Sequence, residues 1–310
     1  MPGGADAQVG FVSETVPGTA VTVTKFLPFI SESIKNNIEY VNTETLSARR
    51  TVRITKRTTF GVEGSIQTEL ANTTLATLLR HMFGTIVTTG AGPFVHTASP
   101  GDLTSKSMTV QVGRPTSTAT VQAFTYAGTK IATWSLSSSV GELAKLELGI
   151  KAMTETTATA LAVASFDTSW SPFVFTEASL TVAAVSAGTV REFNLSGDNK
   201  IEFRHRLGVA TSKEPLENGV RDYTGTVTTD FDALTHYNLF VNGTPSALVL
   251  TFNNGTQTLQ ITCNVQFTGE TPNVGGNDLL AQTLPFRCIS PTSDANAITA
   301  VLSNSESSSV

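Results

Sequence analysis

A strand-like stretch followed by a short helical pattern occurs twice in this 310-residue chain, and it constrains the fold more than any other feature. In the first copy, residues 64–70 alternate between polar and apolar side chains. Apolar residues then recur over 75–82 at spacings of three and four, which predicts a helix at about 72–83. Asn72 is expected to be its N-cap, and Gly84 stands where a helix needs a left-handed C-terminal residue.

The second copy has the same order of features. Its alternating part is 225–231, and a second short helix is expected at 232–242. An offset of 161 residues places Ile66 on Val227 and conserves polarity along the strand, while the helices align two residues closer. We interpret the repeat as an internal duplication of roughly half the chain.

Composition indicates an all-β protein with one short helix in each domain. Only 15% of residues are charged, against the usual ~25%, and Pro and Gly separate short alternating runs. A Thr- and Ala-rich stretch that ends in Ser-Pro separates the two halves. The expected organisation is an N-terminal arm (1–10), a first domain (11–155), a linker (156–171), a second domain (172–302) and a flexible tail (303–310).

Charge and targeting signals exclude several classes of protein. The net charge of −5 argues against a protein whose main task is to grip phosphates. No apolar run reaches the ~20 residues of a membrane span, and the first ten residues lack the features of a secretory signal. Two cysteines, Cys263 and Cys288, do not form a disulfide framework and suit a reducing compartment. The expected site of synthesis and assembly is the cytoplasm.

Catalytic and metal-binding patterns are not visible in the sequence. The four histidines have no metal-ligand spacing, and neither cysteine has a nearby partner. Glu63 and Glu69 could pair for acid-base chemistry, but alternation along a strand explains both as surface or interface residues. We therefore expect no enzyme, no cofactor and no metal.

Several stretches together resemble a known family. They are GSIQTELAN (64–72), LLRHMFG (78–84), GDLTSKSMTVQVGRP (101–115), WSLSSSVGELAKLELG (134–149), KEPLENGVRDYTGTVTTDF (213–231) and FTGETPNVGGNDLLAQTLPF (267–286). As an ordered set they resemble the major tail proteins, or tail tube proteins, of long-tailed bacteriophages, over about residues 8–303. The resemblance implies a β-sandwich that lends strands to a barrel shared by a ring. Stacked rings would enclose the tape-measure protein and later pass DNA, and tail terminator and tip proteins would be further partners.

The family resemblance gives no catalytic residues to transfer, and it predicts a structural virion protein that assembles in the host cytoplasm. If a ring holds six tube domains, a duplicated chain needs only three copies, so we expect a trimeric ring with pseudo-sixfold symmetry. Strands rich in Thr and poor in charge leave sheet edges that can pair with other chains, and closure into a ring removes these edges. The acidic balance predicts a lumen that is acidic or neutral.

The two halves differ in charge, and the difference suggests an assembly contact. Residues 1–155 hold 13 basic and 11 acidic residues, whereas 156–310 hold 7 and 14, so the nets are +2 and −7. The offset of 161 places Arg53 on Glu214 and Lys56 on Glu217. The hypothesis is that the basic segment of one chain faces acidic groups of another; the alternative is that both are solvated loops. The candidate residues are Arg49, Arg50, Arg53, Lys56, Arg57, Glu214 and Glu217.

Other classes of function remain open at this point. A carbohydrate-binding or adhesion module would suit two β domains, but aromatic residues make up only 7% of the chain. A hydrolase on a β scaffold lacks a visible nucleophile and base. Another ring protein of the virion, such as a tail terminator or a capsid decoration protein, is the third alternative. Filaments or rings of the concentrated protein would favour the tube, and monomers would favour the binding module.

Overall fold

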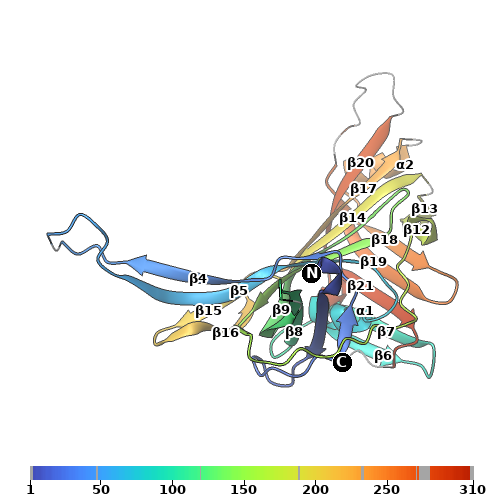
Figure 1. Cartoon of the computed structure of the whole chain (residues 1–310). Helices are drawn as coiled ribbons and strands as arrows, with labels where there is room; N and C mark the ends of the chain where they lie inside the picture. Colours follow the sequence, from blue (N-terminus) through green and yellow to red (C-terminus); the bar gives the residue numbers. More distant parts are fainter. Residues whose placement is uncertain are drawn as a thin grey trace.

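The computed structural model describes residues 3–307 apart from 47, 119, 188, 232–233, 270 and 272–279. Strands dominate, and the described residues contain two short α-helices (Figure 1), which confirms the all-β class. A compact body carries a long hairpin that projects from it, drawn in blue at the left of Figure 1. A shorter hairpin lies beside the base of the long one.

In the first half of the chain, the described residues form α1 and eleven strands. A 3-10 turn at Gly4–Asp6 precedes the first strand. The elements are β1 (Gln8–Ser13), β2 (Lys25–Leu27), β3 (Ser31–Glu32), β4 (Lys35–Asn42), β5 (Thr55–Glu69), α1 (Leu75–Phe83), β6 (Gly84–Thr89), β7 (Phe94–Pro100), β8 (Met108–Pro115), β9 (Val121–Ser139), β10 (Lys145–Ala152) and β11 (Thr154–Thr156).

In the second half, the residues that the structure describes form α2 and ten strands, with 3-10 turns at Phe175–Glu177 and Asp294–Asn296. The elements are β12 (Ala178–Val182), β13 (Val185–Ser186), β14 (Val190–Asp198), β15 (Ile201–Arg206), β16 (Val209–Glu217), β17 (Asp222–Asp230), α2 (Leu234–Val241), β18 (Ser246–Asn253), β19 (Thr258–Phe267), β20 (Ala281–Cys288) and β21 (Ile298–Asn304).

Strand pairing repeats between the halves. In the first sheet layer, β1–β2 corresponds to β12–β13, β1–β8 to β12–β18, β8–β9 to β18–β19, and β9–β11 to β19–β21. In the second layer, β4–β5 corresponds to β14–β17, β5–β10 to β17–β20, and β9–β10 to β19–β20. Register repeats as well, because Ile66 faces Leu148 in the first half and Val227 faces Leu284 in the second. The hairpin β6–β7 has no such counterpart and packs beside β21. This repeated topology supports the inferred duplication.

One large sheet joins the two halves. Its strands follow the order β4, β5, β10, β9, β14, β17, β20, and the junction is the antiparallel pair β9–β14, from Ser139 opposite Glu192 to Thr133 opposite Asp198. Behind the junction, Trp134 packs against Phe83 and Tyr223 with ring centroids 5.4 and 6.0 Å apart. These contacts bury the C-terminal end of α1 against strands from both halves.

The first helix begins later than the sequence predicts. Its N-cap is Thr74, and Asn72 lies before the helix, buried, so the prediction of Asn72 as N-cap is wrong. The Asn72 amide instead accepts a hydrogen bond from Ser171 N at 2.8 Å and donates to Ser169 O at 3.0 Å. Those backbone groups of the linker need a buried partner, and Asn72 supplies it. At the other end, Gly84 has a φ of 97°, as its position predicted.

The second helix follows β17 as α1 follows β5. Its described part is Leu234–Val241, and Gly243, with a φ of 60°, ends it as Gly84 ends α1. The expected first residue, Asp232, lies outside the described residues. Leu234 and Val241 are exposed, whereas almost all of α1 is buried.

Several expected boundaries differ from the structure. Strand β1 starts at Gln8 and Val9 is buried, so the end of the expected N-terminal arm belongs to the core. Strand β9 is continuous over 19 residues, because it bends from one sheet layer into the other. At the C-terminal end, β21 continues to Asn304, whose amide bonds to His96 within the core.

Candidate assembly surface

The face of the large sheet that is turned away from the core is mostly polar, and Ala281 and Pro285 of β20 are apolar residues on it. Alternate residues of its strands are buried and apolar, and the residues between them point outward. Hydroxyls dominate the outer face: Ser65, Thr133, Ser135, Ser137, Ser139, Ser196, Thr224, Thr226, Thr228 and Thr283. A sheet with one apolar and one polar face is expected when that face is in contact with water.

Charged side chains on this polar face carry a small acidic excess. Seven strand positions are acidic (Glu63, Glu69, Glu147, Glu192, Asp198, Asp222, Asp230) and four are basic (Lys35, Lys145, Lys151, Arg287). Two further cations, Arg191 and Lys200, form ion pairs with Asp230 and Asp198, which reduces the excess. A groove of about 720 Å³ runs along the face between β4 and the base of β15. Glu63, Lys151 and Asp198 are among its lining residues. Small side chains and weak negative charge make the face smooth and unattractive to anions.

One edge of the large sheet is open. Among the described residues, β3 and β4 pair with β5 alone, so their other side offers free backbone donors and acceptors. The corresponding side of β14 is covered by β9. An uncovered edge is a template for another strand, and a stable protein must protect or use it.

The projecting hairpin β4–β5, here called the first arm (residues 35–60), is basic. It holds six basic and two acidic residues, and no ion pair within the described part of the chain involves its tip. Arg57 lies 5.0 Å from the ring centre of Phe60. The five basic residues proposed from the sequence, Arg49, Arg50, Arg53, Lys56 and Arg57, are all exposed on this arm.

The second arm, β15–β16 (residues 201–217), corresponds to the first arm but is shorter, and its base is fixed to the body. Glu214 forms a 2.6 Å ion pair with Lys130, whose side chain is only 1% exposed, and accepts a 2.6 Å hydrogen bond from Ser105 N. Glu217 pairs with Arg221. The two carboxylates singled out from the sequence therefore already have partners within the chain, and the structure does not bring them near the basic tip of the first arm.

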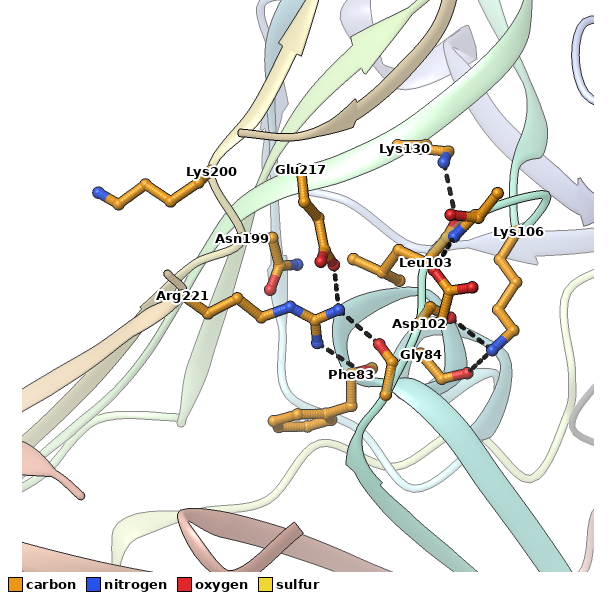
Figure 2. Close-up of polar contacts among 12 residues, drawn as sticks. Phe83, Gly84, Asp102, Leu103, Lys106, Lys130, Asn199, Lys200, Glu217 and Arg221 are labelled. Atoms are coloured by element: carbon orange, nitrogen blue, oxygen red, sulfur yellow. Dashed lines mark hydrogen bonds and ion pairs between the residues drawn. The ribbon is translucent and has the colours of Figure 1, made fainter. Parts of the chain in front are cut away.

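These contacts are part of a polar cluster around the C-terminal end of α1 (Figure 2). Arg221 donates to Phe83 O at 2.9 Å and to Gly101 O, and Lys106 donates to the carbonyls of Gly84 and Asp102. Cations satisfy the free carbonyls at a helix C-terminus and complement its dipole. Because Arg221 comes from the second half and α1 from the first, the cluster fixes the two halves to each other.

Lys130 is the most deeply buried cation of this cluster. Besides Glu214, its ammonium group donates to Leu103 O at 2.7 Å. Desolvation lowers the pKa of Lys130, and the Glu214 carboxylate opposes that shift. Neither Lys130 nor Arg221 was singled out from the sequence, since each looks like an ordinary charge on an alternating strand. The offset of 161 residues relates Glu214 to Arg53 of the first arm, but it carries no information about the residue that Glu214 contacts.

His81, on the buried side of α1, predicts a dependence of stability on pH. Its Nε2 lies 2.9 Å from Ser13 Oγ, and burial, with a contribution from Arg80, lowers its pKa to about 3. The unfolded chain takes up this proton near pH 6.5, so the unfolded state binds more protons between the two values. Stability is therefore expected to fall as the pH drops below about 6.5, by up to ~1.4 kcal/mol per unit.

Urea unfolding at pH 7 and pH 4.5 measures this effect. His81→Gln is expected to lose part of the decrease in stability that the parent shows between the two pH values. His205→Gln, at an exposed histidine, is the matched control and keeps the parental decrease. Equal decreases for parent and His81→Gln would contradict a neutral, buried His81.

A family model described as phage tail tube protein matches residues 4–288. The chain belongs to the phage tail tube protein family. A search of curated proteins gave no match. This tail tube protein is accordingly a structural protein of the phage virion, located in the tail and associating into a tube.

The rest of the described structure adds no further type of site to the tail tube protein. No cluster of three or more His, Cys, Asp or Glu residues able to hold a metal ion occurs among the described residues. Within the same part of the chain, no helix is long and apolar enough to span a membrane.

Proposed function

We propose that this tail tube protein assembles into rings of three chains with pseudo-sixfold symmetry, which stack to form the conduit for DNA. The observation that carries the proposal is the large sheet, which spans both halves of the chain, buries one face, exposes a polar face and ends in an open edge. Two domains placed side by side in one sheet are one third of a six-domain barrel.

The junction between the halves is a model for the junctions between chains. Within the chain, β9 of the first half pairs with β14 of the second along seven residues. The edge strands β3 and β4 are the counterparts of β14, since Glu32 faces Ile66 as Phe193 faces Val227. Repetition of the same junction between chains would close the sheet into a barrel and remove its edges.

The polar face would then line the lumen. Its hydroxyls dominate, and its cations are outnumbered by carboxylates, several of which pair with them, so the face offers DNA few free cations. A wall rich in Lys and Arg would bind phosphates by releasing counterions and would slow the passage of DNA. An acidic to neutral lumen is the surface that a conduit needs.

A basic lumen is therefore expected to delay DNA release. Replacing Ser135, Ser196 and Thr226 with Arg adds three cations per chain to the polar face. We expect DNA ejection from the resulting particles to slow by tenfold or more at low salt, and the delay to shrink as salt rises. The same three positions changed to Gln are the control for size. Unchanged ejection kinetics in the Arg variant would place the polar face away from the lumen.

The partners follow from the same geometry. The lumen would hold the tape-measure protein before DNA passes, and the ends of the tube would meet tail terminator and tip proteins, with assembly in the host cytoplasm. The basic tip of the first arm would face acidic groups of another chain. Glu214 and Glu217 were the first candidates, but they already pair with Lys130 and Arg221 within the chain, so the partner carboxylates would be others.

Negative-stain microscopy of the concentrated protein tests the proposal. Rings or tubes of uniform diameter are the expected result. A monodisperse monomer at every concentration, in the absence and presence of the other tail proteins, would overturn it and would favour a binding module built on the same fold.

A further inference from the structure

We propose that the end of β20 around Arg287 is the docking surface for the base of the first arm of a second chain, with Arg287 placed over the ring of Tyr40. The proposal rests on the proposed ring, and it identifies the residues that meet between neighbouring chains. It follows from a contact that the duplicated chain already makes inside itself.

The internal contact joins the first half to the base of the second arm. Lys151, near the end of β10, donates to Ile201 O at 2.9 Å, and its ammonium group lies 5.3 Å from the ring centre of Phe203. Phe203 covers Gly61 so closely that a Cβ there would lie 2.8 Å from the ring. Ile201 is only 2% exposed. A cation, an aromatic ring and a buried aliphatic residue thus hold the second arm in place.

The repeat identifies which residues occupy the equivalent positions on the two sides of this contact. In the first half Lys151 faces Glu63, and in the second half Arg287 faces Thr224. Since the offset of 161 relates Glu63 to Thr224, Arg287 is the structural counterpart of Lys151. The same offset relates Ile201 to Tyr40, on β4 of the first arm.

Within the described part of the chain, these counterparts make no such contact. The side chain of Arg287 is 61% exposed and forms a surface ion pair with Asp222. Tyr40 and Val41 are 60% and 57% exposed. An exposed cation that has only a surface ion pair, and an exposed apolar patch, therefore occupy the positions whose equivalents are buried at the internal junction.

A second copy of this chain is the occupant that suits both surfaces. If neighbouring chains meet as the two halves do, the first arm of one chain crosses the end of β20 of the next. Val41 and Tyr40 would be covered as Ile201 is. The offset relates Phe203 to Asn42, which has no ring, so Arg287 would meet the ring of the neighbouring Tyr40 in place of the ring that Lys151 meets. The pairing is between unlike halves, which suits a head-to-tail ring.

Photo-crosslinking in assembled tubes tests the contact directly. A benzophenone amino acid at position 40 of the full-length protein is expected to form an adduct between chains that mass spectrometry maps to the peptide containing Arg287. The same probe at Leu207, at the exposed tip of the second arm, is the matched control and should not label that peptide. Assembled tubes in which the position-40 adduct maps elsewhere would overturn the inference and leave the tube itself standing.

Substitution at Arg287 gives an independent readout. Arg287→Lys installs the cation found at the equivalent position of the first half and should assemble like the parent. Arg287→Glu should raise the protein concentration needed for assembly by about threefold to thirtyfold, the range expected for losing a cation–π contact. Equal assembly of both variants would overturn the docking surface, whereas failure of the parent to form rings would reject the proposed function.

Discussion

Reversing two charges of the first arm, Arg53→Glu with Lys56→Glu, is expected to stop tube growth while leaving the fold intact. Both residues are exposed and lack an ion pair in the described part of the chain, so their substitution removes no internal contact. An exposed pair contributes only ~0.5 kcal/mol. Two such charges in each of three chains would nevertheless add up to ~3 kcal/mol for all the contacts of one ring. That free energy corresponds to an increase of about a hundredfold in the protein concentration needed for assembly.

The charge-conserving variant Arg53→Lys with Lys56→Arg controls for the loss of side-chain shape. It should assemble like the parent, and circular dichroism should show the parental fold for both variants. Sedimentation of assembled material at low and high salt gives the readout, because screening weakens the contact in the parent. If the double Glu variant polymerises like the parent at both salt concentrations, the first arm is not an assembly contact.

A compensating reversal at Glu214 and Glu217 does not make a clean test of the same contact. Changing Glu214 to Lys would place two ammonium groups next to each other at Lys130, and changing Glu217 would remove the partner of Arg221. Loss of assembly in such a variant would report on the stability of the second arm.

Lys130→Met is expected to lower the free energy of unfolding by about 3 kcal/mol. The substitution leaves Glu214 without its partner and Leu103 O without its 2.7 Å donor, both at a poorly hydrated position. Breaking one side of a buried pair costs several kcal/mol because the remaining group stays desolvated. Since Glu214 retains the hydrogen bond from Ser105 N and some solvent exposure, the lower part of that range applies.

Denaturant unfolding of the unassembled protein measures this loss. Lys145→Met is the matched control, because Lys145 also pairs with a glutamate, Glu142, but both side chains are well exposed. Its expected cost is below ~1 kcal/mol. Similar losses for the two variants would mean that the Lys130–Glu214 pair does not anchor the second arm.

The repeat in the sequence predicted the parts of the fold that depend on local pattern. Alternation over 64–70 and 225–231 became β5 and β17, and the spacing of apolar residues became α1 and α2. Glycine at the end of each helix was readable because only its left-handed conformation suits that position. Boundaries were less predictable, since Asn72 has the character of an N-cap but serves a buried linker backbone instead.

The contacts between the halves could not be read from the sequence. The 161-residue offset relates the two arms, but it could not show that the second arm is the shorter one and is anchored beside the base of the first (Figure 1). That difference depends on Lys130 and Phe203, which meet their partners across 84 and 142 residues of chain, respectively. Long-range pairs of this kind leave no periodicity in the sequence.

The mass of one ring tests the account most directly. Native mass spectrometry of rings released from short tubes should give three chains of 32.7 kDa, close to 98 kDa. That result would agree with six tube domains supplied by a duplicated chain and one sheet closed through its open edge. Rings of six full chains, or a chain that never leaves the monomeric state, would contradict the account.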